Sequence, residues 1–144
     1  MATDTSEKNL ETILVSYLRD SNGYEEGCSE DYSKDYALDR QRIKRFLLST
    51  QKKKKKNTAC FINELAERKF FTELNKQLTT RGVTDVLRKG FRYISELFDM
   101  YYPLPSELNP TAQEMYAKNI FCVTRQLYYS KDNSNSIDVM VSLN

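Results

Sequence analysis

The sequence predicts an α/β fold of the α+β type, in which helices pack on an incomplete mixed sheet. Apolar residues recur at helical spacing in residues 1–90, whereas aromatic and β-branched residues dominate residues 91–144 and alternate there with other side chains. The last strand-like run reaches the chain terminus, so the sheet is expected to lack a strand there. Residues 1–144 are expected to form a single domain, helical over 1–90, rich in strands over 91–144 and incomplete at its C-terminal end.

The first expected helix is amphipathic and spans residues 7–19, with Ser6 as its N-cap. Residues 20–34 are polar and acidic and contain Asn22-Gly23, which indicates turns and loops with room for a short hairpin. The apolar side chains of the helix share one face, which is expected to pack on another part of the fold: Leu10, Ile13, Leu14, Tyr17 and Leu18.

Three more helices are expected before residue 91. The second helix has an apolar staple in Leu38 and an N-cap in Asp39, and the third and fourth helices are stopped by Gly82 and Gly90. Their predicted bounds are Asp39 to Ser49, Asn57 or Thr58 to Gly82, and Thr84, as the N-cap, to Lys89.

The C-terminal part is expected to contain strands and one helix. Residues 97–102 are predicted to form a strand, although helical spacing also fits this segment. Asn109-Pro110 is a strong helix start, and the helix is expected to run to about Asn119. Residues 121–129 and 137–143 alternate as strands do, and the polar residues 130–135 between them allow a hairpin.

The composition excludes several classes of protein. Because the chain contains no His, it cannot form a Ser-His-Asp triad, a Cys-His pair, or a zinc or haem site with histidine ligands. Its four glycines fit neither the GxGxxG nor the GxxxxGK phosphate loop. Cys28, Cys60 and Cys122 are odd in number and far apart, which indicates reduced thiols in a cytoplasmic protein. No apolar run approaches the ~20 residues of a membrane span, and the first residues lack the basic region of a signal peptide.

Basic residues are concentrated in the middle of the chain. Residues 41–92 contain 15 basic and 4 acidic residues, which gives +11 in a chain whose net charge is +2. The run Lys52 to Lys56 could contact phosphates, but a solvated loop is the simpler interpretation. Arg88, Lys89 and Arg92 cluster at a predicted helix end, where they suit the helix dipole and could also contact the phosphates of DNA.

Two carboxylates stand at unusual positions in their predicted elements. Glu11 lies at the border of the apolar stripe of the first helix, from which it could reach a cleft. Asp138 interrupts a β-branched strand, on the face opposite Ile137 and Val139. Without further information, each is interpreted as a solvated surface acid.

Several stretches show a more specific pattern. They are residues 83–91 (VTDVLRKGF), 108–110 (LNP) and 119–130 (NIFCVTRQLYYS), with shorter matches at Glu11, Gly23-Tyr24, Tyr36 to Asp39 and Ser136 to Val139. In this order and spacing the sequence resembles the N-terminal region of the R subunits of type I restriction enzymes, over nearly the whole chain. The strings VTRQL and DVLRKGF are the most specific parts of the resemblance.

The resemblance implies a Mg²⁺-dependent nuclease domain of the PD-(D/E)xK type. In such R subunits this domain is joined to an ATP-driven DNA translocase and works with methylation and specificity subunits. By resemblance, Asp138 is the metal-binding Asp, and Glu11 is the acidic residue of the first core helix that helps to bind the ion. Ile137 precedes Asp138 where the motif has Pro, a departure that the family tolerates.

The Glu-x-Lys half of such a site should lie on the next strand, but the sequence ends at Asn144, so we expect an incomplete active site. Glu67-Arg68-Lys69 has the right spacing but precedes Asp138 in a predicted helix, and is interpreted as helix surface. The chain is therefore interpreted as a fragment of an R subunit, inactive alone and without the ATP-binding motor. The alternative is a non-catalytic module that docks on DNA or on other subunits through residues 39–89.

The metal site makes a geometric prediction. Because Glu11 and Asp138 must share one ion, their carboxylates are expected within about 8 Å of one another, facing an open cleft. The first helix should then lie across the C-terminal strands, with Leu10 and Leu14 packed on the sheet and Glu11 at its rim.

Overall fold

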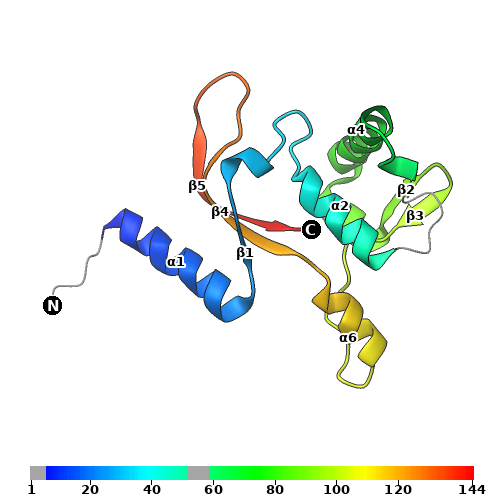
Figure 1. The fold of residues 1–144 in the computed structure, drawn as a ribbon, viewed down its shortest axis with the longest axis horizontal. Coiled ribbons are helices and arrows are strands. Elements are labelled where there is room, and N and C mark those ends of the chain that lie inside the picture. Colours follow the sequence, from blue (N-terminus) through cyan, green and yellow to red (C-terminus); the bar gives the residue numbers. More distant parts are fainter. Residues whose placement is uncertain (1–5, 52–58) are drawn as a thin grey trace.

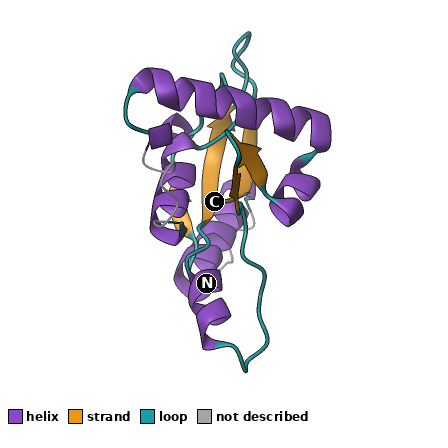
Figure 2. Cartoon of the chain, turned by 90° about the vertical axis from the view of Figure 1, so that its right-hand side faces the viewer, coloured by secondary structure: helices purple, strands orange, loops and turns teal. Residues whose placement is uncertain are grey.

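The computed structural model describes residues 6–51 and 59–144, and its fold is mixed α and β, as predicted. A three-stranded sheet separates helix α1 from helices α2 and α4, beside which a small hairpin lies (Figure 1). Figure 2 shows the strands lying between the helices. The elements are α1 (Glu7–Asn22), β1 (Glu25–Gly27), the 3₁₀ turn η1 (Ser29–Asp31), α2 (Arg40–Thr50), α4 (Glu64–Arg81), α5 (Val83–Lys89), β2 (Phe91–Tyr93), β3 (Glu96–Phe98), α6 (Pro110–Ala117), β4 (Phe121–Tyr128) and β5 (Ser136–Leu143).

The larger sheet has the strand order β1-β4-β5 and is mixed, as the sequence predicted. The hairpin of β4 and β5 is confirmed, with Phe121 opposite Leu143 and Tyr128 opposite Ser136. The prediction of turns and a possible hairpin over residues 20–34 missed β1, which pairs in parallel with β4. Because Gly27 has no side chain, β1 can lie this close to β4; a Cβ at this position would lie 2.7 Å from Thr124 Oγ1.

Helix α1 begins as predicted, because the Ser6 side chain accepts a hydrogen bond from the backbone N–H of Asn9. It runs three residues past the predicted end at Arg19, to Asn22, and stops where Gly23 adopts a left-handed φ of 70°. Val15 is its one buried residue.

The orientation of α1 corrects the prediction that its apolar stripe packs on the sheet. The side of the helix that carries Val15 faces β4, and the stripe faces away from the sheet. Charged side chains on the inner side find partners there: Arg19 pairs with Glu26 of β1 at 2.6 Å, and Glu11 pairs with Arg125 of β4 at 3.2 Å. The exposed members of the stripe are Leu10 (63%), Ile13 (55%), Leu14 (45%) and Tyr17 (61%).

The helices between residues 40 and 89 follow the predicted order but differ in their starts. Asp39 caps α2, as predicted, by accepting a hydrogen bond from the Arg42 backbone N–H. The predicted starts of the third helix, Asn57 and Thr58, lie outside the described residues. The described helix α4 begins after Asn63, whose side chain accepts from the Ala66 backbone N–H at 2.8 Å, so the prediction of one continuous helix is wrong.

Helix α5 also begins differently from the prediction. Gly82, with φ 84°, ends α4 and directly precedes α5, so the predicted N-cap Thr84 lies inside the helix. Gly90 ends α5 as predicted. Asn109 and Pro110 start α6 as predicted, and the helix ends at Ala117, two residues before the predicted end.

The predicted strand over residues 97–102 is shorter than expected and has a partner that was not foreseen. It comprises Glu96–Phe98 and pairs with β2 in a hairpin whose two-residue turn places Ile94 and Ser95 at positive φ. Tyr102 lies in the loop that follows.

An aromatic core joins this hairpin to α2 and α4. The Phe70 ring is fully buried and lies at its centre. Edge-to-face contacts of this kind add to the stabilisation from burial alone. The rings within 6 Å of Phe70 are those of Phe61, Phe71, Phe91, Tyr93 and Phe98.

None of the helices among the described residues is both long enough and apolar enough to span a membrane.

Arg42 ties the start of α2 to the strand layer. Its guanidinium is 2.6 Å from Asp39, 2.9 Å from Asp31 and 3.1 Å from Glu25, and its side chain is only 14% exposed. The hydrogen bond from Arg42, followed by one from the Cys28 backbone N–H, lowers the pKa of Asp31 below its ordinary value. One cation therefore serves carboxylates from β1, η1 and the cap of α2.

Replacing Arg42 with Met should lower the free energy of unfolding by about 2–4 kcal/mol, because three carboxylates lose a largely buried common cation. The lowered pKa of Asp31 stabilises the fold at a pH above its unfolded value of about 3.9, and this contribution disappears as the pH falls through the lower folded value. Urea unfolding between about pH 6 and pH 2 should therefore show a smaller acid-dependent loss in Arg42→Met than in the natural chain.

Arg45→Met is the matched control, because Arg45 also pairs with Glu25 but is half exposed. It should cost at most about 1 kcal/mol. Equal losses of unfolding free energy in the two variants would show that the greater burial of Arg42 does not make its ion pairs more stabilising than that of Arg45.

Candidate metal centre

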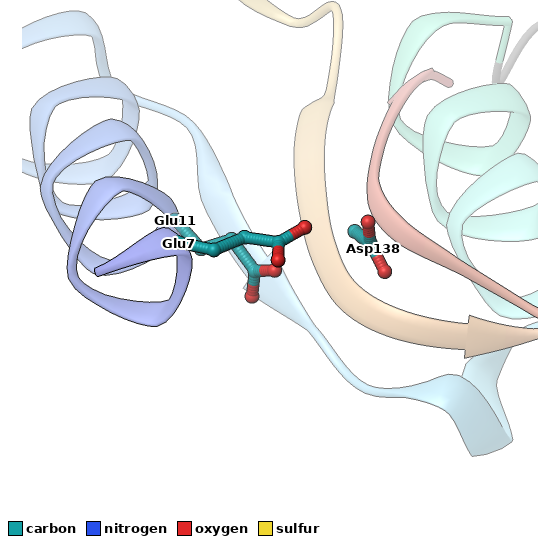
Figure 3. Close-up of side chains that lie close together, drawn as sticks. All are labelled: Glu7, Glu11 and Asp138. Carbon is teal, nitrogen blue, oxygen red and sulfur yellow. The ribbon is translucent and has the colours of Figure 1, made fainter. Parts of the chain in front are cut away.

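Three carboxylates from opposite ends of the chain meet beside the sheet. Glu7 and Glu11 lie one turn apart on α1, and Asp138 lies on β5. Each offers an oxygen within 4.8 Å of the others. Figure 3 shows the two Glu side chains pointing from the helix toward Asp138. The geometry predicted for Glu11 and Asp138 is thus confirmed, whereas their binding of a metal stays a prediction.

The carboxylates line an open pocket with a volume of about 520 Å³. Glu7 and Asp138 are exposed and Glu11 is partly buried. Carboxylate oxygens are the hard ligands that Mg²⁺ prefers, so the donor set suits this ion. Two positively charged side chains also line the pocket, one from α1 and one from β4. Its lining residues are Ser6, Glu7, Lys8, Glu11, Arg125, Gln126 and Asp138.

Sequence reasoning missed Glu7 as a member of the cluster. The signal was present, because residues four apart on a helix are neighbours on one face and Glu7 precedes Glu11 by four. The predicted packing of Leu10 and Leu14 on the sheet concealed this signal, because it placed Glu11 at the rim of the contact. With the helix turned as observed, both acids face the strands.

Arg125 joins β4 to the inner side of α1. Its Nη2 lies 3.2 Å from Glu11 Oε2 and 3.5 Å from the Lys8 carbonyl oxygen, and its Nη1 donates to Thr12 Oγ1 at 3.1 Å. The Glu11 side chain is 13% exposed and the Arg125 side chain 29%. The ion pair is therefore largely shielded from water, where a charge–charge contact is stronger than at an open surface.

The β4–β5 ladder is interrupted beside the cluster. Residues 121–125 and 127–128 of β4 have partners in β5, but Gln126, which stands opposite Asp138, has none in the ladder. Gln126 adopts φ 50°, a left-handed conformation that is uncommon for a residue with a side chain.

This interruption accounts for the direction of Asp138. Cross-strand partners share a face of the sheet, so Val139 lies on the same face as its partner Arg125, which contacts α1. Strict alternation would place Asp138 on the opposite face, as the sequence predicted. The Asp138 carboxylate instead reaches Glu7 and Glu11 on α1, at the point where Gln126 breaks the pleat.

The predicted DNA contacts Arg88, Lys89 and Arg92 do not line this pocket. They are exposed at the end of α5 and in β2, and β2 lies across the molecule from α1 (Figure 1). Lys89 pairs with Asp85 at 3.0 Å, in keeping with the helix-end interpretation. Lys52 to Lys56 lie outside the described residues.

The earlier Glu67-Arg68-Lys69 motif lies in α4, as predicted. Glu67 pairs there with Lys44 of α2 at 3.3 Å, and Arg68 pairs with Glu64 at 2.6 Å within the helix. None of the three lines the carboxylate pocket. The interpretation of this motif as helix surface is therefore consistent with its contacts.

No family model, curated protein or solved structure matches the chain. The case for a metal centre therefore depends on the donor set, the geometry and the sequence motifs.

The conformation of Gln126 predicts an order of tolerance to substitution. A left-handed backbone costs a side-chain-bearing residue roughly 1–2 kcal/mol, and a β-branched residue suffers most, so Gln126→Val should destabilise the fold by about 1–2 kcal/mol. Gln126→Gly should change stability by less than about 0.5 kcal/mol, because relief of strain offsets the greater backbone entropy of the unfolded chain. Urea unfolding measures both.

Ser136→Val is the control, since Ser136 is also exposed in this hairpin and pairs regularly with Tyr128. It should be nearly neutral, within about 0.5 kcal/mol. Equal tolerance of Val at both positions would contradict a required left-handed conformation at Gln126.

Proposed function

We propose that the chain forms the divalent-metal-binding part of a DNA-cleavage domain like that of the type I R subunits its sequence resembles. The observation that supports this most directly is the convergence of Glu7, Glu11 and Asp138 within 4.8 Å in an open pocket. Two of these three residues are the ones that the resemblance selects as metal ligands, and they come from opposite ends of the sequence.

Each residue of the pocket has a role in this proposal. Asp138 and Glu11 hold Mg²⁺, and Glu7 adds a third carboxylate, directly or through water. A bound Mg²⁺ would supply two effects at this site, activation of a water molecule for attack and neutralisation of phosphate charge. Lys8 and Arg125, which line the same pocket, add positive charge where a DNA phosphate would lie.

The residues after Asp138 include no Glu and no Lys, so the Glu-x-Lys half of the site is absent from this sequence. We therefore propose that this chain binds the metal but does not cleave DNA by itself. A complete parent enzyme would supply that half and an ATP-driven motor, and would work in the cytoplasm with methylation and specificity subunits.

Magnesium titration tests the proposed centre. By calorimetry the natural chain should bind Mg²⁺, and the ion should raise its melting temperature because it binds the folded state. Glu11→Gln and Asp138→Asn should each weaken binding by roughly tenfold or more, since each removes a charged ligand. Glu7→Gln should have a smaller effect, because Glu7 is an additional ligand in the proposal.

Glu114→Gln is the matched control, because Glu114 is an exposed acid on α6 outside the pocket, and its Mg²⁺ affinity should equal that of the natural chain. Affinity unchanged by both Glu11→Gln and Asp138→Asn would exclude the cluster as a metal site. With plasmid and Mg²⁺ we expect no nicking. Nicking that Asp138→Ala abolishes would show that the chain contains a complete active site.

DNA binding by the basic middle of the chain should be weak, insensitive to sequence and strongly dependent on salt, with Kd of roughly 10⁻⁴–10⁻⁶ M. The double variant Arg88→Gln/Arg92→Gln should weaken binding and reduce the slope of log K against log salt by about 2, because each contact releases about one counterion. Fluorescence anisotropy with duplex DNA at several salt concentrations measures the slope.

Lys118→Gln removes an exposed charge next to α6 and should leave the slope unchanged if the contact surface is the predicted one. An identical slope in the double variant and the natural chain would remove Arg88 and Arg92 from the DNA contacts.

A further inference from the structure

We infer that Arg125 is a positioning residue for the carboxylate cluster: it holds Glu11, and the turn of α1 on which Glu11 lies, in register with Asp138. This inference rests on the proposed function, since it concerns the capacity of the cluster to hold a divalent cation. Arg125 itself is not proposed to touch the ion.

The contacts of Arg125 connect the two elements that supply the carboxylates. Its backbone belongs to β4, at the position paired with Val139, the residue that directly follows Asp138 in β5. Its guanidinium reaches three points on one stretch of α1: the Lys8 carbonyl oxygen, Glu11 Oε2 and Thr12 Oγ1. Among the described residues, no other side chain forms an ion pair with Glu11.

The geometry of the guanidinium fork fits this role better than a point charge would. Nη1 and Nη2 are fixed in one plane and bind different acceptors, so the fork sets both the position and the rotation of the helix. Arg125 binds Glu11 through Oε2, so the ion pair restrains the carboxylate without using its second oxygen, Oε1. A carboxylate fixed in this way loses less rotamer freedom when it binds an ion.

The charge of Arg125 acts in the opposite direction, because a cation 3.2 Å from Glu11 repels a second cation at the same carboxylate. The two effects predict different results. If Arg125 were a counter-charge alone, Arg125→Met would tighten Mg²⁺ binding and Arg125→Lys would leave it unchanged. If it positions Glu11, both substitutions weaken binding, because Lys keeps the charge but loses the fork.

Calorimetric titration of the whole chain with Mg²⁺ tests the inference. We expect Arg125→Lys and Arg125→Met each to bind Mg²⁺ at least fivefold more weakly than the natural chain. The double variant Arg125→Met/Glu11→Gln should bind no more weakly than Glu11→Gln alone, since a residue that acts through Glu11 has no effect once Glu11 is removed. Circular dichroism and urea unfolding verify that each variant is folded at the titration temperature.

Arg19→Met is the matched control, because it removes the other ion pair between α1 and the sheet, with Glu26, and Arg19 does not line the cluster pocket. Its Mg²⁺ affinity should equal that of the natural chain, so a loss as large as in Arg125→Met would reduce Arg125 to a general helix tether and overturn the inference. Binding by Arg125→Met as tight as or tighter than the natural chain, or additive losses in the double variant, would also overturn it. If the natural chain binds no Mg²⁺, the proposed metal centre itself fails, and the inference with it.

Discussion

The parallel pairing of β1 with β4 is the constraint on which the rest of the structure depends. It joins strands from opposite halves of the sequence, and it requires Gly27, because a side chain there would collide with Thr124 and Cys122. Since two residues separate α1 from β1, this pairing also places α1 against β4. The hairpin partner of β4 then brings Asp138 to the same place, so one backbone contact assembles the carboxylate cluster.

Ion pairs accompany the face of α1 that meets the sheet. Leaving an apolar stripe in water is unfavourable, so the observed orientation needs specific compensation on the inner side. The pair of Arg19 with Glu26 is too exposed to supply much, whereas the pair of Glu11 with Arg125 is largely shielded. The pair of Glu11 with Arg125 is therefore the stronger of the two electrostatic contributions to this orientation. The same orientation directs Glu11 to the cluster.

Local signals in the sequence predicted the elements well, and contacts between distant segments were harder to predict. Ser6, Asp39 and Asn109 cap helices as expected, because a cap depends on neighbours within three residues. Strand β1 was missed because its three residues have no strand pattern of their own and are ordered by β4. The proximity of Glu11 and Asp138 was predicted from the family resemblance, because the sequence around either residue gives no indication of the other.

A left-handed backbone conformation has an ordinary cause at Ile94 and Ser95 and a special one at Gln126. Ile94 and Ser95 occupy a two-residue hairpin turn, a type in which both central residues have positive φ. Gln126 lies inside a strand with regular pairs on both sides, so no turn requires its conformation. Strain of this kind persists when the surrounding structure imposes it, and it is frequent where side chains are aimed for function. Here it stands directly opposite Asp138, the residue whose side chain must leave the alternation of the strand to meet α1. The left-handed backbone of Gln126 and the direction of the Asp138 side chain thus occur at one position of the hairpin, at the point where the carboxylate cluster forms.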